Sequence, residues 1–252
     1  MKITTHSIIL ITTFSVSLLL ISFLFWGPYF APQVLAVAIV GFFIYWLFRS
    51  YSVVVACFVG LARLRSWKRT NWVAKYCAWL PAHADAKAWE GPRHMVIIPN
   101  YKEEEHGLAR TLESLARQPN SRQLVVVMAM EDREPGNREK SARLIETFRD
   151  NFAEMFSTHH PAGLPSATPG KGSNEAWAAR EAYERLIVRA GDDLRRYTIT
   201  SCDADAVFHE RHFEALNYLF LTAKNPYRTF WQPAIFNSNN IWDIPAPLRI
   251  MD

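Results

Sequence analysis

Residues 93–104, RHMVIIPNYKEE, decide the fold, because an unbroken apolar run is closed there by a proline and followed by polar residues. Such a run is typical of a strand buried on both faces, as in a parallel sheet. Comparable runs follow at residues 124–130 and 197–202, and stretches with helical periodicity lie at 104–118, 137–150 and 173–190. This alternation predicts an α/β domain with a Rossmann-like, parallel or mixed sheet and flanking helices.

Weaker signals predict further elements of the same domain. Residues 156–160 are expected to form a short third strand, 213–221 a helix, and 227–237 one more strand. Residues 163–172 are rich in glycine, proline and serine and predict a loop, after which Ser173 is expected to cap the next helix.

Upstream of this domain, the sequence predicts a transmembrane hairpin. Residues 7–26 carry no charge, and a second uncharged run ends at Phe48 after the breakers Gly27, Pro28 and Pro32. About 20 helical residues cover the roughly 30 Å of bilayer hydrocarbon, so each run is long enough to cross it. Residues 50–62 are expected to continue the second helix along the interface. The predicted division is then 1–80 for the membrane part, 81–92 for a linker, and 93–252 for the α/β domain.

Charge is divided unevenly along the chain. No Asp or Glu precedes Asp85, while seven Lys and Arg do, so this stretch carries +7 and the remainder 21 − 24 = −3. Basic residues flanking apolar spans indicate a membrane surface rather than nucleic acid, and they place the α/β domain in the cytoplasm.

Three scattered cysteines without a CxxC pair agree with reduced thiols in the cytoplasm. The alternative, a cleaved secretory signal, is disfavoured by the length of the first apolar run and by the second run that follows at once.

Polar segments stand where the predicted strands end. They are Asn100 to Glu103, Glu131 with Asp132, GKGSN at residues 170–174, and Asp203 with Asp205. Ligands of open α/β sheets bind at the carboxyl ends of the strands, so these segments are expected to converge on one edge.

Asp203 and Asp205 are two residues apart, so both carboxylates would point to the same side if the strand geometry persists, with Ala204 turned away. Mg²⁺ or Mn²⁺ often takes one or two carboxylates and completes its coordination with water and phosphate oxygens. The pair therefore predicts a divalent cation with a diphosphate ligand. The alternative is a solvated Asp203 and an Asp205 that caps the helix near His209.

Lys171 lies between two glycines at the predicted start of a helix. The segment is not a Walker A loop, because Gly163 is too far upstream and Gly172 replaces the Ser or Thr that would bind magnesium. Backbone N–H groups at a helix start and the Lys171 ammonium nevertheless favour an anion such as phosphate. A surface loop with a solvated lysine is the alternative.

Taken in this order, IIPNYKEE, ED, GKGSN and TSCDAD resemble the motifs of membrane-bound family-2 glycosyltransferases with the GT-A fold. The resemblance covers residues 93–252. It implies that Pro99, Tyr101 and Glu103 form a nucleotide pocket and that Asp132 lies near the base. It also implies that Lys171 and Asn174 belong to the nucleotide-sugar site, with Lys171 at the diphosphate, and that Asp203 contacts the nucleotide sugar while Asp205 holds the metal.

The resemblance implies metal-assisted, inverting transfer of a sugar from a nucleoside diphosphate sugar to a lipid or polysaccharide acceptor at the cytoplasmic face of the cell membrane. Family members carry an acidic general base further on. Asp243 is a weak candidate, so the base is expected beyond Asp252 and the chain is expected to be an N-terminal fragment. Two alternatives stay open: a catalytically inactive, membrane-tethered nucleotide-binding or scaffold protein, and a sugar nucleotidylyltransferase. The latter would carry a glycine- and arginine-rich loop where Asn100, Tyr101 and Lys102 stand.

Overall fold

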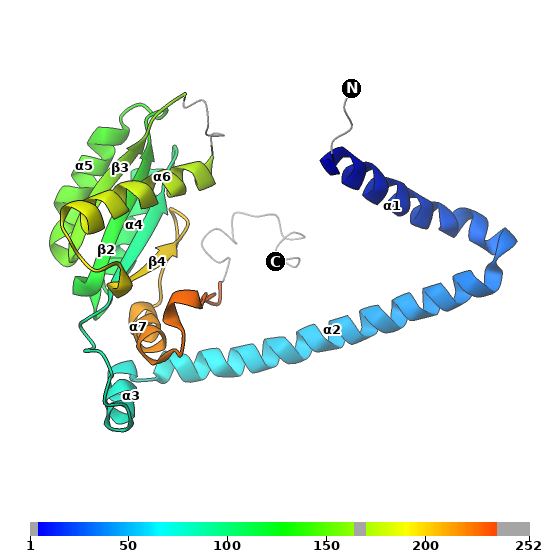
Figure 1. The fold of residues 1–252 in the computed structure, drawn as a ribbon, viewed down its shortest axis with the longest axis horizontal. Coiled ribbons are helices and arrows are strands. Elements are labelled where there is room, and N and C mark those ends of the chain that lie inside the picture. The colour runs from blue at the N-terminus through cyan, green and yellow to red at the C-terminus, as the bar shows by residue number, and fades with distance from the viewer. Residues whose placement is uncertain (1–4, 164–169, 236–252) are drawn as a thin grey trace. The chain divides into compact units, whose positions relative to one another are not determined.

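The computed structural model describes residues 5–163 and 170–235 of the chain. The chain divides into two compact units, Met1–Trp67 and Lys68–Asp252, which we describe one at a time. Figure 1 shows long helices in the first unit and a sheet with helices on both faces in the second.

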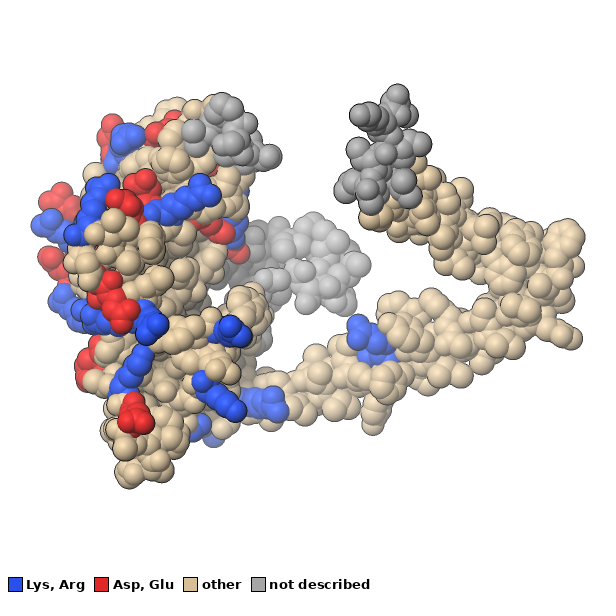
Figure 2. Space-filling view, in the orientation of Figure 1, with Lys and Arg blue, Asp and Glu red and all other residues tan. Residues whose placement is uncertain are grey.

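The first unit consists of α1 (Thr5–Phe30) and most of α2 (Pro32–Arg69). Both helices are long and apolar enough to span a membrane. Figure 2 shows their surfaces as almost entirely uncharged, with a few basic side chains along α2, whereas charged side chains of both signs cover the second unit.

One detail of the predicted hairpin was wrong. Helix α1 does not break at Gly27 and Pro28 but continues to Phe30, and the Gly27 carbonyl accepts a helical hydrogen bond from the Ala31 N–H (2.8 Å). The second helix continues past Phe48 through residues 50–62, as expected, and ends at Arg69. No proline follows Pro32 before that point. Its 38 residues at 1.5 Å each make it about 57 Å long, nearly twice the hydrocarbon thickness.

The second unit opens with the short helix α3 (Trp72–Trp79). The Asn71 side chain caps it by accepting a hydrogen bond from the Ala74 N–H (3.0 Å). The buried Trp72 ring packs at 5.4 Å from the ring of Tyr218, which belongs to α7 (His212–Thr222). Helix α3 is therefore part of the α/β unit.

Four parallel strands form the sheet of this unit. They are β1 (Arg93–Pro99), β2 (Leu124–Glu131), β3 (Glu154–His160) and β4 (Tyr197–Ser201), in the order β3-β2-β1-β4. The pairings are in register, with Ile97 opposite both Val127 and Ser201. The predicted α/β class and all four runs expected around these strands are confirmed. Because every strand runs the same way, their carboxyl ends share one edge.

Helices cover both faces of the sheet (Figure 1). On one face, α4 (Glu105–Ala116), α5 (Asn137–Phe148) and α7 bury an apolar core with β1 and β2, to which they contribute Leu112, Leu144 and Phe213. On the other face lies α6 (Lys171–Tyr183), which a π-helical turn, Glu184–Arg189, extends. Small side chains of α6, such as Ala178 and Ala182, let it pack closely on the sheet.

Two further local predictions were wrong. Helix α6 begins at Lys171, so Ser173 is not its cap, and the Ser173 hydroxyl instead donates to the Gly170 carbonyl (2.8 Å). The strand expected at 227–237 is absent from its described part, where a 3₁₀ turn, Pro226–Arg228, precedes irregular chain. Phe230 and Ile235 are 85% and 70% exposed there. Their side chains therefore lack the packing against a neighbouring strand on which β propensity depends. Residues 236–237 and Asp243 lie outside the described residues.

Candidate functional site

The structure brings Lys171 and Asp203 together at the carboxyl edge of the sheet. The two residues are far apart in the sequence, at the start of α6 and just after β4, yet the Lys171 ammonium donates a hydrogen bond to the Asp203 carboxylate. Lys171 Nζ also lies 3.8 Å from Glu175 Oε1. The hydrogen bond to Asp203 raises the pKa of Lys171, against a smaller opposing effect of burial. Lys171 is thus a fixed cation beside two carboxylates.

Asp203 and Asp205 flank a buried alanine after β4. The strand ends at Ser201, and a turn follows in which the Ala206 N–H donates to the Asp203 carbonyl (3.1 Å). Ala204 packs into the core, and its carbonyl accepts a hydrogen bond from the Thr111 hydroxyl (2.7 Å). Because Ala204 points into the core, the side chains of Asp203 and Asp205 on either side of it are exposed. The alternation expected for a strand is thus present although both residues follow the strand. Asp205 does not cap a helix, because α7 begins only at His212.

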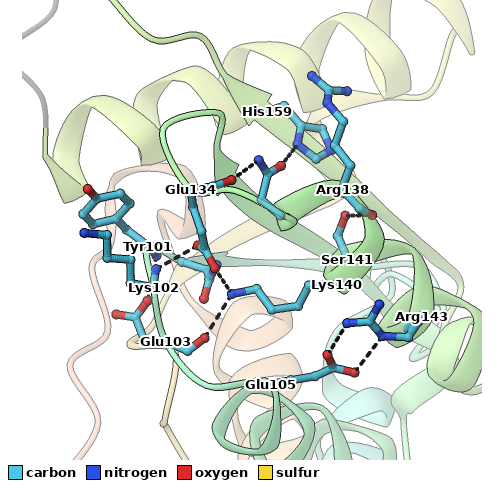
Figure 3. Close-up of polar contacts among 12 residues, drawn as sticks. Tyr101, Lys102, Glu103, Glu105, Glu134, Arg138, Lys140, Ser141, Arg143 and His159 are labelled. Atoms are coloured by element: carbon cyan, nitrogen blue, oxygen red, sulfur yellow. Dashed lines mark hydrogen bonds and ion pairs between the residues drawn. The ribbon is translucent and has the colours of Figure 1, made fainter.

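A buried polar network holds the loop after β1, and Glu134 is at its centre (Figure 3). The Glu134 carboxylate accepts hydrogen bonds from the Asn100 side chain (3.1 Å) and the Lys102 N–H (2.8 Å), and it forms an ion pair with Lys140. The Lys140 ammonium also donates to the Glu103 carbonyl (3.0 Å). The network joins the loop after β1 to the first turn of α5.

Lys102 adopts a left-handed backbone conformation in this loop, with φ of 69°. This conformation costs a non-glycine residue about 1–2 kcal/mol. The hydrogen bond from its N–H to buried Glu134 offsets part of that cost. Backbone strain of this kind tends to occur at functional sites.

The expected nucleotide pocket residues around β1 have different surroundings. Pro99 is buried at the end of β1, while Tyr101 and Glu103 are exposed. The Arg133 guanidinium lies 4.6 Å from the centre of the Tyr101 ring, and the Glu103 carboxylate accepts a hydrogen bond from the Tyr101 N–H (2.6 Å). Arg133 also donates to buried Glu131 (2.6 Å). Tyr101 therefore presents an aromatic face backed by a cation, while Pro99 serves to end the strand.

Asp132 faces a different set of groups on the β3 side of the sheet. It accepts two hydrogen bonds from Arg138, at 3.0 and 3.2 Å, and lies 3.8 Å from His159 Nδ1. Burial is the largest cause of the lowered pKa of His159, Arg138 lowers it further, and Asp132 opposes both. The His159 ring is thus neutral at neutral pH, and the negative charge of the neighbouring Asp132 is balanced by Arg138.

Two buried asparagines meet at the Ala129 carbonyl, which accepts hydrogen bonds from the Asn174 side chain (2.7 Å) and the Asn100 N–H (2.8 Å). The Oδ1 atom of each asparagine has no hydrogen-bond partner among the described residues. An unsatisfied buried acceptor costs about 1–3 kcal/mol. These oxygens are therefore suited to accept hydrogen bonds from a group that enters the edge of the sheet.

The carboxylates of Asp203 and Asp205 are hard oxygen donors, which suit Mg²⁺ or Mn²⁺. Across residues 5–163 and 170–235, no group of three or more His, Cys, Asp or Glu side chains is placed to hold a metal ion. A divalent cation at this pair would have to take its other ligands from water and phosphate oxygens. Nearby Cys202 is a poor ligand or nucleophile, because burial raises the pKa of its thiol to about 12.

Sequence reasoning missed Glu134 and Lys140. Both lie in EDREPGNREK, residues 131–140, where seven charged residues crowd a turn and the start of a helix. Such a run usually marks a solvated surface, and no spacing distinguishes the two buried side chains from their exposed neighbours. The Pro135-Gly136 turn between them was the available signal, since it folds the first turn of α5 back toward the sheet.

Compared with models of known protein families and with curated proteins, the chain matches none. The fold and the site define it as an α/β protein with a four-stranded, all-parallel sheet and two N-terminal helices long enough to span a membrane. Any finer functional class has to be argued from its own residues.

Proposed function

We propose that the chain is a membrane-anchored glycosyltransferase of the GT-A type. It would take a sugar from a nucleoside diphosphate sugar and pass it to a lipid or polysaccharide acceptor at the cytoplasmic face of the membrane. The observation that carries this proposal is the contact between Lys171 and Asp203 at the carboxyl edge of the sheet.

Three features of the same edge support the proposal. The loop after β1 is fixed by Glu134 and offers the Tyr101 ring to a base or sugar. The side-chain oxygens of Asn100 and Asn174, which have no hydrogen-bond partner within residues 5–163 and 170–235, lie buried at the same end of the sheet. The Asp203–Asp205 pair supplies carboxylates to a cation of the kind that accompanies a diphosphate.

The chemistry that this arrangement favours is departure of a nucleoside diphosphate. Breaking the bond between sugar and diphosphate leaves extra negative charge on the departing oxygen, and Lys171 is placed to stabilise it. A divalent cation held by Asp203 and Asp205 would supply further stabilisation as a Lewis acid. Removing one preorganised group of this kind costs about 3 kcal/mol of transition-state stabilisation.

Binding is the most direct test, since no general base for the sugar transfer is assigned among residues 5–163 and 170–235. The full chain in detergent micelles is titrated calorimetrically with UDP and GDP, each with and without Mn²⁺. We expect saturable binding of one nucleotide that needs Mn²⁺. Asp203→Asn should weaken it about 100-fold, which corresponds to roughly 3 kcal/mol.

Asp150→Asn is the matched control, because the Asp150 side chain is 94% exposed after α5. It should bind nucleotide like the wild type. Absence of nucleotide binding to the folded wild type, or equal affinities for all three proteins, would reject the proposal. Hydrolysis of UDP-sugars and GDP-sugars, followed in parallel, separates a turning-over enzyme from a protein that only binds nucleotide.

A further inference from the structure

A second polar site lies between α5 and β3, on the face of the sheet opposite to α6. The structure has a cavity of about 380 Å³ there, whose lining includes Arg138, Ser141 and Arg149 on one side and Ser157 and His159 on the other. Figure 3 shows His159, Arg138 and Ser141 near the first turns of α5. The proposed glycosyl transfer uses neither Ser157 nor His159.

Ser157 and His159 are two residues apart in β3, so they face the same side of the sheet. Ser157 Oγ lies 3.1 Å from His159 Nε2, and His159 Nδ1 lies 2.7 Å from Asn137 Oδ1. These contacts form a chain of hydroxyl, imidazole and amide. It matches the pattern in which a base contacts a nucleophile and a third group orients the base.

Hydrogen bonding fixes the direction of this chain. The Asn137 amide nitrogen donates to the Glu134 carbonyl (2.7 Å), which can only accept, so the amide oxygen must face His159. That oxygen also only accepts, so His159 carries its proton on Nδ1. In the neutral ring, Nε2 is then unprotonated and accepts from the Ser157 hydroxyl. The lowered pKa of His159, caused first by burial and then by Arg138, keeps the ring in this form.

We propose that Ser157 is a nucleophile and His159 its general base, in a second site that cleaves small esters bearing an anionic group. Asn137 is a positioning residue for the imidazole. Arg149 lies on the cavity wall, where its only ion pair among the described residues is a loose one of 3.9 Å to exposed Asp150. Its guanidinium is therefore placed to bind a carboxylate or phosphate on the ester.

The reaction balances with water as the second reactant. The Ser157 oxygen forms a bond to the acyl carbon while its proton moves to His159 Nε2, and the ester C–O bond breaks as the alcohol leaves with that proton. Water then attacks the acyl group. Its proton passes through His159 back to the Ser157 oxygen, and the carboxylic acid is released.

An alkyl fluorophosphonate tests the nucleophile directly, because its P–F bond breaks as a serine oxygen bonds to phosphorus. The full chain in detergent micelles is treated with this probe, and the adduct is located by peptide mass spectrometry. We expect one adduct, at Ser157. His159→Gln should slow its formation about 100-fold, the lower range of a general base's contribution.

Ser141→Ala is the matched control. Ser141 lines the same cavity, but its hydroxyl donates to the Arg138 carbonyl (3.0 Å) and contacts no imidazole in the described chain. Labelling should survive in this variant and disappear in Ser157→Ala. No adduct at Ser157 in the folded wild type, or an unchanged rate in a folded His159→Gln, would overturn the proposal.

The preference of this site for esters that bear an anionic group is tested with two 4-nitrophenyl esters, the neutral acetate and the negatively charged hemisuccinate. The wild type should hydrolyse the hemisuccinate about tenfold faster, as one charge-assisted contact provides. Arg149→Gln should abolish this preference, so that the variant hydrolyses the two esters at equal rates. Equal rates for both esters in the wild type would contradict the assignment to Arg149. Nucleotide binding at Lys171 does not enter these measurements, so either proposal can fail alone.

Discussion

His94 shows how the fold controls the charge of a single residue. It lies in β1, fully buried, with its Nδ1 atom 2.8 Å from the Thr198 hydroxyl and its ring beside Phe213. Burial is the main cause that lowers the pKa of His94 from 6.5 to about 4; nearby His212 lowers it further, while the neighbouring Asn217 side chain opposes the shift. The native state therefore holds this imidazole in its neutral form at neutral pH.

The sign of the pH effect follows from this shift. The unfolded chain binds a proton at His94 near pH 6.5, whereas the folded chain resists until about pH 4. The stability linked to neutral His94 is thus complete above pH 6.5 and lost as the pH falls toward 4. Protonation of His94 over this range lowers the free energy of unfolding by roughly 3 kcal/mol in total. We expect the melting temperature of the full chain in micelles to fall steeply across this window.

Two histidine variants isolate the contribution. His94→Leu should make the fall between pH 6.5 and 4 shallower without removing it, because burial also lowers the pKa of His212 to about 4. The slope reports the number of protons taken up, so it changes even if the variant is less stable at every pH. His106→Asn should keep the wild-type slope, since His106 is exposed in the first turn of α4. A His94→Leu profile as steep as the wild type would show that other groups cause the acid sensitivity.

At the scale of elements, the Glu134–Lys140 pair joins α5 to the loop after β1. Both side chains are buried, and the same carboxylate holds Asn100 and the strained Lys102 backbone. Breaking a buried pair by removing one charge commonly costs about 3–5 kcal/mol. Glu134→Gln should therefore lower the free energy of unfolding by about this amount, as measured by denaturant titration monitored through tryptophan fluorescence.

Glu105→Gln is the control for this variant. Glu105 pairs with Arg143 between α4 and α5 (Figure 3), and the two side chains are 41% and 61% exposed. Exposed pairs contribute little, so this change should leave the unfolding midpoint nearly unaltered. Glu134→Gln with Lys140→Met should recover part of the loss, because no lone charge stays buried. Equal effects of Glu134→Gln and Glu105→Gln would refute a structural role for the buried pair.

The strands could be predicted because each is an apolar run whose length and boundary residues leave few choices. Pro99 and Cys202 mark strand ends that the structure places within a residue. The first residues of helices were harder to predict, because Gly170, Lys171 and Ser173 are close together and each suits the start of α6. The segment at 227–237 has strand-like composition, but a strand also needs a partner, and sequence composition does not supply one. Composition also fails to show which charges are buried, as with Glu134 and Lys140.

The candidate site was predictable in outline for a related reason. Parallel strands send all their carboxyl ends to one edge, so polar residues after strands must gather there. That argument correctly predicted that Lys171 and Asp203 would lie close together. Strand β4 ends at Ser201, however, so the Asp203 side chain is exposed by the turn after the strand and not by the alternation of side chains along the strand. The Ser157, His159 and Asn137 chain joins β3 to α5, and its contact depends on side-chain rotamers that no spacing rule encodes.

At the scale of the whole molecule, the distribution of charge predicts which side of the membrane holds the α/β unit. Helix α2 carries Arg63, Arg65, Lys68 and Arg69 in its last two turns, and no acidic residue precedes Asp85. Basic flanks are retained in the cytoplasm during insertion. Cys77, exposed on α3 shortly after these residues, is a native reporter of sidedness.

A membrane-impermeant maleimide makes the orientation measurable. In a chain that carries Cys57→Ser, because Cys57 is also exposed, we expect it to label Cys77 in inside-out vesicles and in permeabilised cells but not in intact cells. Adding Cys77→Ser should remove that signal. Cys202 contributes little, because its thiol is half-buried and its pKa is raised to about 12, so few thiolates form. Labelling of Cys77 in intact cells would place the α/β unit outside the cytoplasm, where nucleoside diphosphate sugars made inside the cell could not reach Lys171 and Asp203.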